Sequence, residues 1–230
     1  MPTPAPRASI ESFFEFNEYC AAALGADPDA RDLEPLLAAA NDKLTRAVSA
    51  RTAAQRAVNR CAALRDFNFR GLMAAVEALE RKASAAFDAG EAAPGYQRLF
   101  VQTPAQMGRS SLESRADLFG RFLAEAQSAE TPASLHRPVK AVALAWSGYQ
   151  TAARNLGAAH SALAKARDKE EAAKVDNITT LRKLEGRLTD RMPADPKRVR
   201  GYFPPTKAAK RAAATGAAGS SPQNGASAAG

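Results

Sequence analysis

The stretch that decides the fold is residues 139–163, VKAVALAWSGYQTAARNLGAAHSAL. Apolar or small residues recur in it at steps of three and four, which is the spacing of one face of an α-helix. The members of this series are Val139, Val142, Trp146, Tyr149, Ala153, Leu156, His160 and Leu163. Because the spacing is that of a heptad repeat, the stretch predicts a long helix whose apolar face, or seam, is covered by another helix.

A matching series lies 102 residues earlier in the chain. Its members are Leu37, Ala40, Leu44, Ala47, Ala54, Val58 and Cys61. Nearby shifts align the flanking segments as well: a shift of 106 places Phe13 and Phe16 on Phe119 and Phe122. Self-similarity at a fixed offset indicates a duplicated structural unit.

These patterns predict an all-α fold, because no stretch alternates apolar and polar residues as a strand would. We expect tandemly duplicated helical units that form an antiparallel helix bundle, with coiled-coil seams. The tail should be disordered, because a basic and then Ala/Gly/Ser-rich composition buries too little apolar area to offset ordering. The predicted parts are a flexible N-terminus (1–8), helical repeat 1 (9–106), helical repeat 2 (110–203) and the tail (204–230).

Each repeat should begin with a short helix, roughly 9–24 and 112–127, followed by a proline-containing loop and a long helical stretch. Ser110 stands three residues before Glu113, which is the spacing of a capping box at the start of the second short helix. These signals set the expected order of elements within each repeat.

The long stretches could each be one helix or a helical hairpin. Candidate breaks are Asn68 and Gly71 in the first repeat, and Gly157 and Asp176–Asn177 in the second. A rod of about 50 residues would span about 75 Å and would need a partner to cover its seam. A hairpin would bury the seam within the repeat, so we favour the hairpin.

The run Arg65–Leu72, RDFNFRGL, follows a long amphipathic stretch, and an aromatic-rich segment from Phe13 to Tyr19 precedes both. In these features the chain resembles a family of uncharacterised bacterial all-helical proteins. The resemblance covers about residues 10–130, and the second repeat departs from it because no F-R-G-L follows Arg167 and Asp168. It implies a helical bundle in a bacterial protein and no activity.

Composition narrows the classes of function. Cys20 and Cys61 have no disulfide or metal-ligand pattern and should be buried free thiols, which suits a reducing cytoplasm. The N-terminal segment lacks a secretory apolar region, and no run of 18 uncharged apolar residues follows. We therefore expect a cytoplasmic protein that neither spans nor binds a membrane.

No site chemistry stands out. His160 falls on the seam without metal-ligand neighbours, so we expect a hydrogen-bonded core or interface histidine, and His136 reads as a solvated loop residue. Arg51 is either part of the solvated helix surface or a member of a buried or interface ion pair. Phosphate-binding loops and a nucleophile elbow are absent from the sequence. We predict no enzymatic activity, catalytic residue, metal, cofactor or small-molecule substrate.

The net charge of +8 is concentrated near the C-terminus: residues 182–211 hold ten basic and three acidic residues. We expect a scaffold or protein-interaction module that binds a protein partner or itself. The alternative is a nucleic-acid-associated protein that contacts the phosphate backbone. The possible nucleic-acid contacts are Lys197, Arg198, Arg200, Lys207, Lys210 and Arg211, and the aromatics expected to dock on the bundle are Tyr202 and Phe203.

Overall fold

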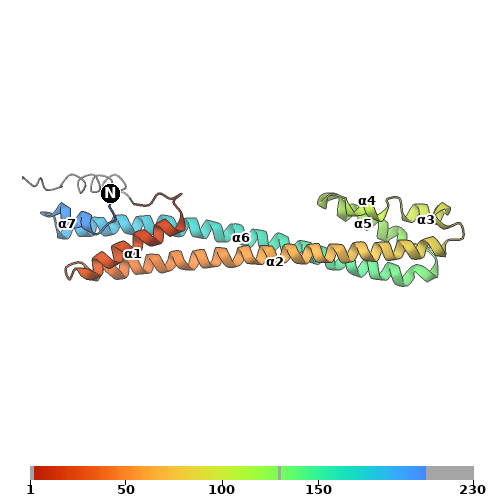
Figure 1. Cartoon of the computed structure of the whole chain (residues 1–230), viewed down its shortest axis with the longest axis horizontal. Coiled ribbons are helices and arrows are strands. Elements are labelled where there is room, and N and C mark those ends of the chain that lie inside the picture. The colour runs from red at the N-terminus through yellow and green to blue at the C-terminus, as the bar shows by residue number, and fades with distance from the viewer. Residues whose placement is uncertain (1–2, 129–130, 206–230) are drawn as a thin grey trace, which may run out of the picture. The chain divides into compact units, whose positions relative to one another are not determined.

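The computed structural model describes residues 3–128 and 131–205, and within these ranges it contains helices and no strand. The all-α prediction is confirmed. In chain order the elements are α1 (Ile10–Ala26), η1 (Arg31–Leu33), α2 (Glu34–Ala86), η2 (Gly90–Ala92), α3 (Pro94–Leu99), α4 (Pro104–Gly108), α5 (Leu112–Ala126), η3 (Ala133–Leu135), α6 (His136–Arg191) and α7 (Pro196–Gly201) (Figure 1). None of the helices described is both long enough and apolar enough to cross a bilayer.

The chain divides into two compact units. Unit 1 combines Met1–Arg51 with Ala166–Gly230, and unit 2 is the continuous stretch Thr52–Lys165. The long helices α2 and α6 each contribute one segment to unit 1 and one to unit 2. The compact units therefore differ from the predicted sequence repeats, since each unit contains the end of one repeat and the beginning of the other.

The expected breaks in the long helices are absent, and the predicted hairpins were wrong. Helix α2 is continuous through Asn68 and Gly71, and α6 through Gly157 and Asp176–Asn177. A break is unnecessary because each long helix covers the seam of the other. In unit 1, Leu37 of α2 shares a core with Leu184 and Leu188 of α6. Each long helix is thus a continuous rod, and the long helix of the other repeat is the partner that covers its seam.

Unit 1 is closed by the short helices at the two ends of the chain. Cys20 and Leu24 of α1 share a core with Val199 of α7 and with Tyr202 and Phe203, which directly follow α7. Phe203 also packs against Phe16, with ring centroids 6.4 Å apart. A smaller core, formed by Phe13, Leu44, Ala173 and Ile178, continues along the same pair of long-helix segments.

Unit 2 has the larger and more aromatic core. Leu72, Val76 and Leu79 of α2 pack with Val139, Val142 and Trp146 of α6, and α3 and α5 cover the pair. Each of these six side chains is buried. Farther along the same helix segments, Val58 shares a small core with Leu156 and Leu163.

Helix starts are set by side-chain caps. Ser9 caps α1, and its Oγ accepts a hydrogen bond from the backbone N–H of Ser12 at 3.2 Å. The cap of α5 is Ser111, which bonds the Ser114 N–H in the same way, whereas Ser110 donates its hydroxyl to the Met107 carbonyl. The predicted capping box from Ser110 to Glu113 was therefore one residue out, because adjacent serines can both serve as caps.

The order of elements is the same in both halves of the chain. A short helix, a 3₁₀ turn, a long helix and a further short helix follow each other in each half, and the first half has η2 and α4 as extra elements. Corresponding elements begin 102 residues apart at Arg31 and Ala133, Glu34 and His136, and Pro94 and Pro196. The offset equals the one that relates the two seams in the sequence.

Candidate functional site

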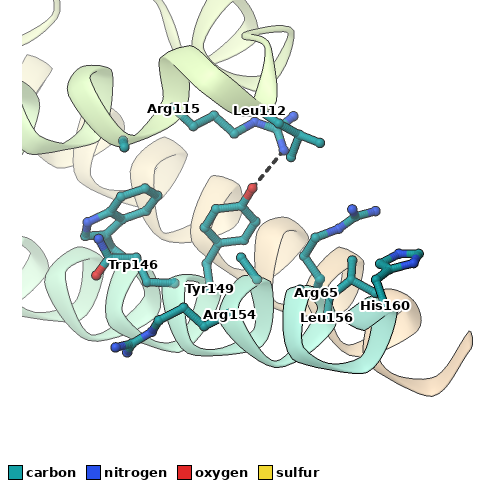
Figure 2. A pocket seen from close by; sticks show the side chains of 12 residues that line it. Arg65, Leu112, Arg115, Trp146, Tyr149, Arg154, Leu156 and His160 are labelled. Atoms are coloured by element: carbon teal, nitrogen blue, oxygen red, sulfur yellow. Dashed lines mark hydrogen bonds between the residues drawn. The ribbon is translucent and has the colours of Figure 1, made fainter. Parts of the chain in front are cut away.

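An open pocket of about 640 Å³ lies in unit 2, where α5 meets α6 and α2 (Figure 2). Helix α5 contributes Leu112 and Arg115, and α2 contributes Arg65. Most of the remaining wall belongs to α6 and includes Trp146, Tyr149, Gln150, Ala153, Arg154, Leu156, Gly157 and His160. We call this pocket the unit 2 cleft.

Local sequence places these side chains. Arg115 is in the first turn of α5, directly after the Ser111 cap, and its backbone N–H bonds the Ser111 carbonyl at 3.2 Å. Trp146 and Tyr149 stand three residues apart and therefore share one face of α6. They point towards α5, so that Arg115 lies above the ring of Tyr149 (Figure 2).

Arg115 is held by aromatic contacts and one hydrogen bond. Its guanidinium lies 3.8 Å from the ring centroid of Phe69, and its Nη1 donates to the Tyr149 hydroxyl oxygen at 3.1 Å. Such a cation–π contact contributes about 0.5–2 kcal/mol, depending on solvent exposure. The Nε–H of Arg115 is buried and has no hydrogen-bond partner. The guanidinium is therefore held in place with donors still unused.

Stacked aromatic rings form the floor of the cleft. Trp146 stacks on Tyr149 with ring centroids 5.4 Å apart and an interplanar angle of 24°. On its other side Trp146 stacks on Phe119, at 4.9 Å and 19°. Both Trp146 and Tyr149 are buried, while Leu112 at the edge is 58% exposed. Apart from the Tyr149 hydroxyl the floor is apolar, and the edge is exposed.

The cleft is positively charged. Of the described residues that line it, three are arginines, one is histidine and none is acidic. Arg65 is compensated by Asp66, with Nη2 and Oδ1 2.6 Å apart. The guanidinium of Arg154 points away from Arg115 and donates to the Thr151 hydroxyl at 3.3 Å (Figure 2). The uncompensated charge facing the floor is therefore that of Arg115.

The lining lacks the parts of an acid–base or nucleophilic centre. Of its described residues none is a serine, threonine, cysteine or carboxylate, so His160 has no nucleophile to activate and no acid to orient it. Within the described part of the chain, no group of three metal-ligating side chains is gathered. The arrangement is suited to binding an anion beside apolar groups.

The two histidines lie on the surface. His160 is exposed at the end of the cleft and is not a core residue. The prediction of a core histidine was wrong, because Leu156 and Leu163 on either side of it are buried while His160 lies off that buried face. That His160 lies in an interface with a partner stays a prediction. His136 is the first residue of α6 and is exposed.

Arg51 forms the ion pair that we weighed against a solvated surface. Its Nε lies 2.6 Å from Oε2 of Glu170, whose side chain is 10% exposed, while the Arg51 side chain is 42% exposed. Lys174 is a second, more distant partner of Glu170 at 3.6 Å. All three residues belong to unit 1, where they stabilise the pairing of α2 with α6.

The basic residues proposed to contact nucleic acid have different surroundings. Lys197 and Arg200 are exposed on α7. Arg198 pairs with Asp27 at 2.6 Å and with Asp29 at 2.8 Å, so its charge is compensated within unit 1. Lys207, Lys210 and Arg211 lie outside the described residues.

The aromatics Tyr202 and Phe203 are 3% exposed and belong to the core of unit 1. The Tyr202 hydroxyl donates a hydrogen bond to Asp27, which Arg198 also contacts. The hydrogen bond from Tyr202 and then that from Arg198 lower the pKa of Asp27 to about 2. Burial, followed by the bond to Asp27, raises the pKa of Tyr202 to about 12. This cluster fastens α7 to the end of α1.

No protein-family model, curated protein or solved structure matches the chain. The resemblance to uncharacterised bacterial helical proteins therefore stays a prediction. The case for a function rests on the residues themselves.

Sequence reasoning missed Arg115, Trp146 and Tyr149 as site residues, although a signal for the two aromatic residues was present. The seam positions of Trp146 and Tyr149 are occupied by Leu44 and Ala47 in the first repeat. Only the second repeat carries aromatic residues there. A difference between the repeats at core positions indicates that the residue type serves a purpose besides packing. That Arg115 contacts Tyr149 and Phe69 depends on how α5 packs on α6 and α2, which the sequence does not specify.

Proposed function

We propose that the protein is a non-enzymatic helical interaction module and that the unit 2 cleft is its contact surface for a protein partner. The observation that carries the proposal is Arg115 in the lining of the cleft, held by the Phe69 ring and by a hydrogen bond to Tyr149 without a carboxylate partner among the described residues. Large aromatic residues and arginine are the side chains that contribute most to protein–protein interfaces. The exposed Leu112 extends the apolar surface at the edge of the cleft.

The lining supports binding in preference to catalysis. Proton transfer or covalent catalysis would need a base next to a nucleophile or acid, and no hydrogen bond joins His160 to Tyr149 in the described lining, where the Tyr149 hydroxyl bonds Arg115 instead. We place the protein in the cytoplasm, and two free cysteines, one of them buried, support that compartment. We also propose that its two halves arose by duplication, which is supported by their common order of elements.

Site-specific crosslinking tests the proposed surface. A photoreactive benzoylphenylalanine at Leu112 should capture a discrete protein partner in cells that express the chain naturally. The matched control carries the same group at Val175, which is 52% exposed on α6 in unit 1. The adduct should form at position 112 and not at 175, and Arg115→Gln should weaken it. Equal labelling at both positions, or none at 112, would reject the cleft as the contact surface.

A second candidate function is association with nucleic acid through the C-terminal basic segment. It is favoured by Lys197 and Arg200, which are exposed on α7 next to the three basic residues of the tail. Because Arg198 is paired, five cations remain, and the log–log salt slope for a duplex should be about −4.5 at about 0.9 counterions each.

The test compares the full chain with residues 1–205, which keep the core residues Tyr202 and Phe203. Fluorescence anisotropy of a labelled random duplex should show the stated slope for the full chain and a reduced slope, from Lys197 and Arg200 alone, after truncation. If the full chain does not bind at low salt, this second function is rejected.

A further inference from the structure

We infer that Arg115 and Tyr149 form a receptor for a carboxylate, supplied by an acidic side chain of the partner that stands next to a large apolar one. The inference rests on the proposed function and specifies the chemistry that the unit 2 cleft recognises. It is carried by three properties of the cleft: its charge, the adjacent donors of Arg115 and Tyr149, and its apolar floor.

The positive charge of Arg115 has no carboxylate partner among the described residues. By contrast, Arg51, Arg65, Arg191 and Arg198 each have an acidic partner within 2.8 Å. Partial burial of an arginine against aromatic rings costs free energy when no anion pairs with its charge. A ligand carboxylate would supply the missing charge.

The donors of the pair suit two acceptor oxygens. Tyr149 accepts a hydrogen bond from Arg115, so the hydroxyl hydrogen of Tyr149 remains free to donate. Arg115 uses one N–H of its Nη1 in that bond, and its guanidinium carries further N–H donors on Nη1 and Nη2. An arginine N–H and a tyrosine O–H side by side present donors alone, which matches a carboxylate and disfavours an amide.

The floor selects what accompanies the carboxylate. Trp146 and Leu156 are mostly buried beneath the cleft, and the exposed Leu112 stands at its edge. A bare anion would leave this apolar surface in contact with water, while an acidic residue beside a leucine or phenylalanine would cover it. A protein segment with alternating acidic and apolar side chains therefore fits both parts of the cleft.

Trp146 is the single tryptophan of the chain, so its fluorescence reports directly on the cleft. We would titrate the full-length protein with a capped peptide of sequence LEFEL and with its neutral counterpart LQFQL, neither of which contains tryptophan or tyrosine. LEFEL should shift the Trp146 emission saturably. LQFQL should bind at least about tenfold more weakly, since a hydrogen bond between charged groups is lost.

Variants identify the receptor. Arg115→Gln should abolish the preference for LEFEL, and Tyr149→Phe, which keeps the ring and the packing, should reduce it. The matched control is Arg121→Gln, which removes the same charge from an exposed position of α5 outside the cleft and should bind like the wild type. Circular dichroism of each variant verifies that it is folded.

Three results would overturn the inference. Equal binding of LEFEL and LQFQL would make the cleft an apolar surface without carboxylate recognition, and crosslinking at Leu112 would then still stand as the test of the proposed function. Wild-type affinity for LEFEL in both Arg115→Gln and Tyr149→Phe would place the carboxylate elsewhere. Inorganic phosphate that shifts Trp146 as strongly as LEFEL at equal concentration would make the site one for free anions.

Discussion

Asp27 links the two ends of unit 1 through its negative charge. It follows the last turn of α1 and accepts hydrogen bonds from Tyr202 and Arg198 in and after α7. These donors hold its pKa at about 2, below the ordinary 3.8 of an aspartate. The folded state therefore favours the charged form of Asp27.

The sign of this shift gives a prediction for acid unfolding. The stabilisation by charged Asp27 is fully present above the ordinary pKa of about 3.8 and is lost as the pH falls through about 2. Asp27→Asn lacks this titration, so its urea midpoint should fall less between pH 5 and pH 2 than that of the wild type, and should be lower at pH 7. An equal loss in both proteins would contradict the assigned role of Asp27.

The residues of the core were largely predictable, whereas those of the cleft were not. Val139, Val142, Leu156 and Leu163 are buried as the seam spacing requires. Arg115 could not be found from the sequence, because its partners Tyr149 and Phe69 lie on two other helices, far from it along the chain. Periodicity reports which face of a helix is covered, but it does not report which side chain of a neighbouring helix reaches that face.

At the scale of elements, the continuity of α2 and α6 is the feature most open to test. Gly71 and Gly157 lie inside these helices, and an added Cβ at either would meet no atom within 4 Å. Gly71→Ala and Gly157→Ala should each stabilise the protein by about 1 kcal/mol, because alanine has the higher helix propensity.

The control for this prediction is Gly90, the described glycine with a positive φ, 56°, in η2. Gly90→Ala should destabilise by about 1–2 kcal/mol, since a Cβ is unfavourable in that conformation. Urea unfolding of the three variants decides the matter. If Gly71→Ala behaved like Gly90→Ala, a turn would replace the continuous helix at that position.

Burial along α6 predicts which of its leucines stabilise the protein. Leu181 is 0% exposed in the core of unit 1, while Leu144 on the same helix is 76% exposed. Leu181→Ala should cost about 2–5 kcal/mol, because it leaves a cavity. Leu144→Ala should change stability by no more than about 0.5 kcal/mol. Similar losses in the two variants would show that the apolar face of α6 has been assigned incorrectly.

The positions of the helices followed from local signals, but the absence of breaks did not. The short helices were predicted within two residues of α1 and α5, because their caps and apolar spacing are local. Gly71 and Asn68 are equally compatible with a helix and with a turn when read alone. What keeps α2 continuous is the buried seam that it shares with α6, which is a property of the fold and not of the segment.

At the scale of the whole molecule, neither repeat contains a complete core. In unit 1, Leu33 and Leu37 from the first repeat depend on Leu181 and Leu188 from the second. A chain limited to residues 9–109 would expose its seam. We expect that fragment to be weakly helical when dilute and to gain helix as its concentration rises, because only a second copy could cover the seam.

Circular dichroism at increasing concentration of the 9–109 fragment measures this dependence, with the full chain as control. The full chain should give a signal per residue that does not change with concentration. A fragment that is fully helical at every dilution and remains monomeric would show that one repeat folds alone, as the predicted hairpins required.

The division into units also determines the order in which contacts can form while the chain is being synthesised. Unit 2 is one continuous stretch, Thr52–Lys165, and its contacts can form soon after that stretch leaves the ribosome. The apolar side of α1, with Phe13 and Leu24, must wait until Ala173, Leu181 and the residues after them have been translated. Helix α1 is therefore synthesised before unit 2 but buried after it, and its apolar side is exposed in the meantime.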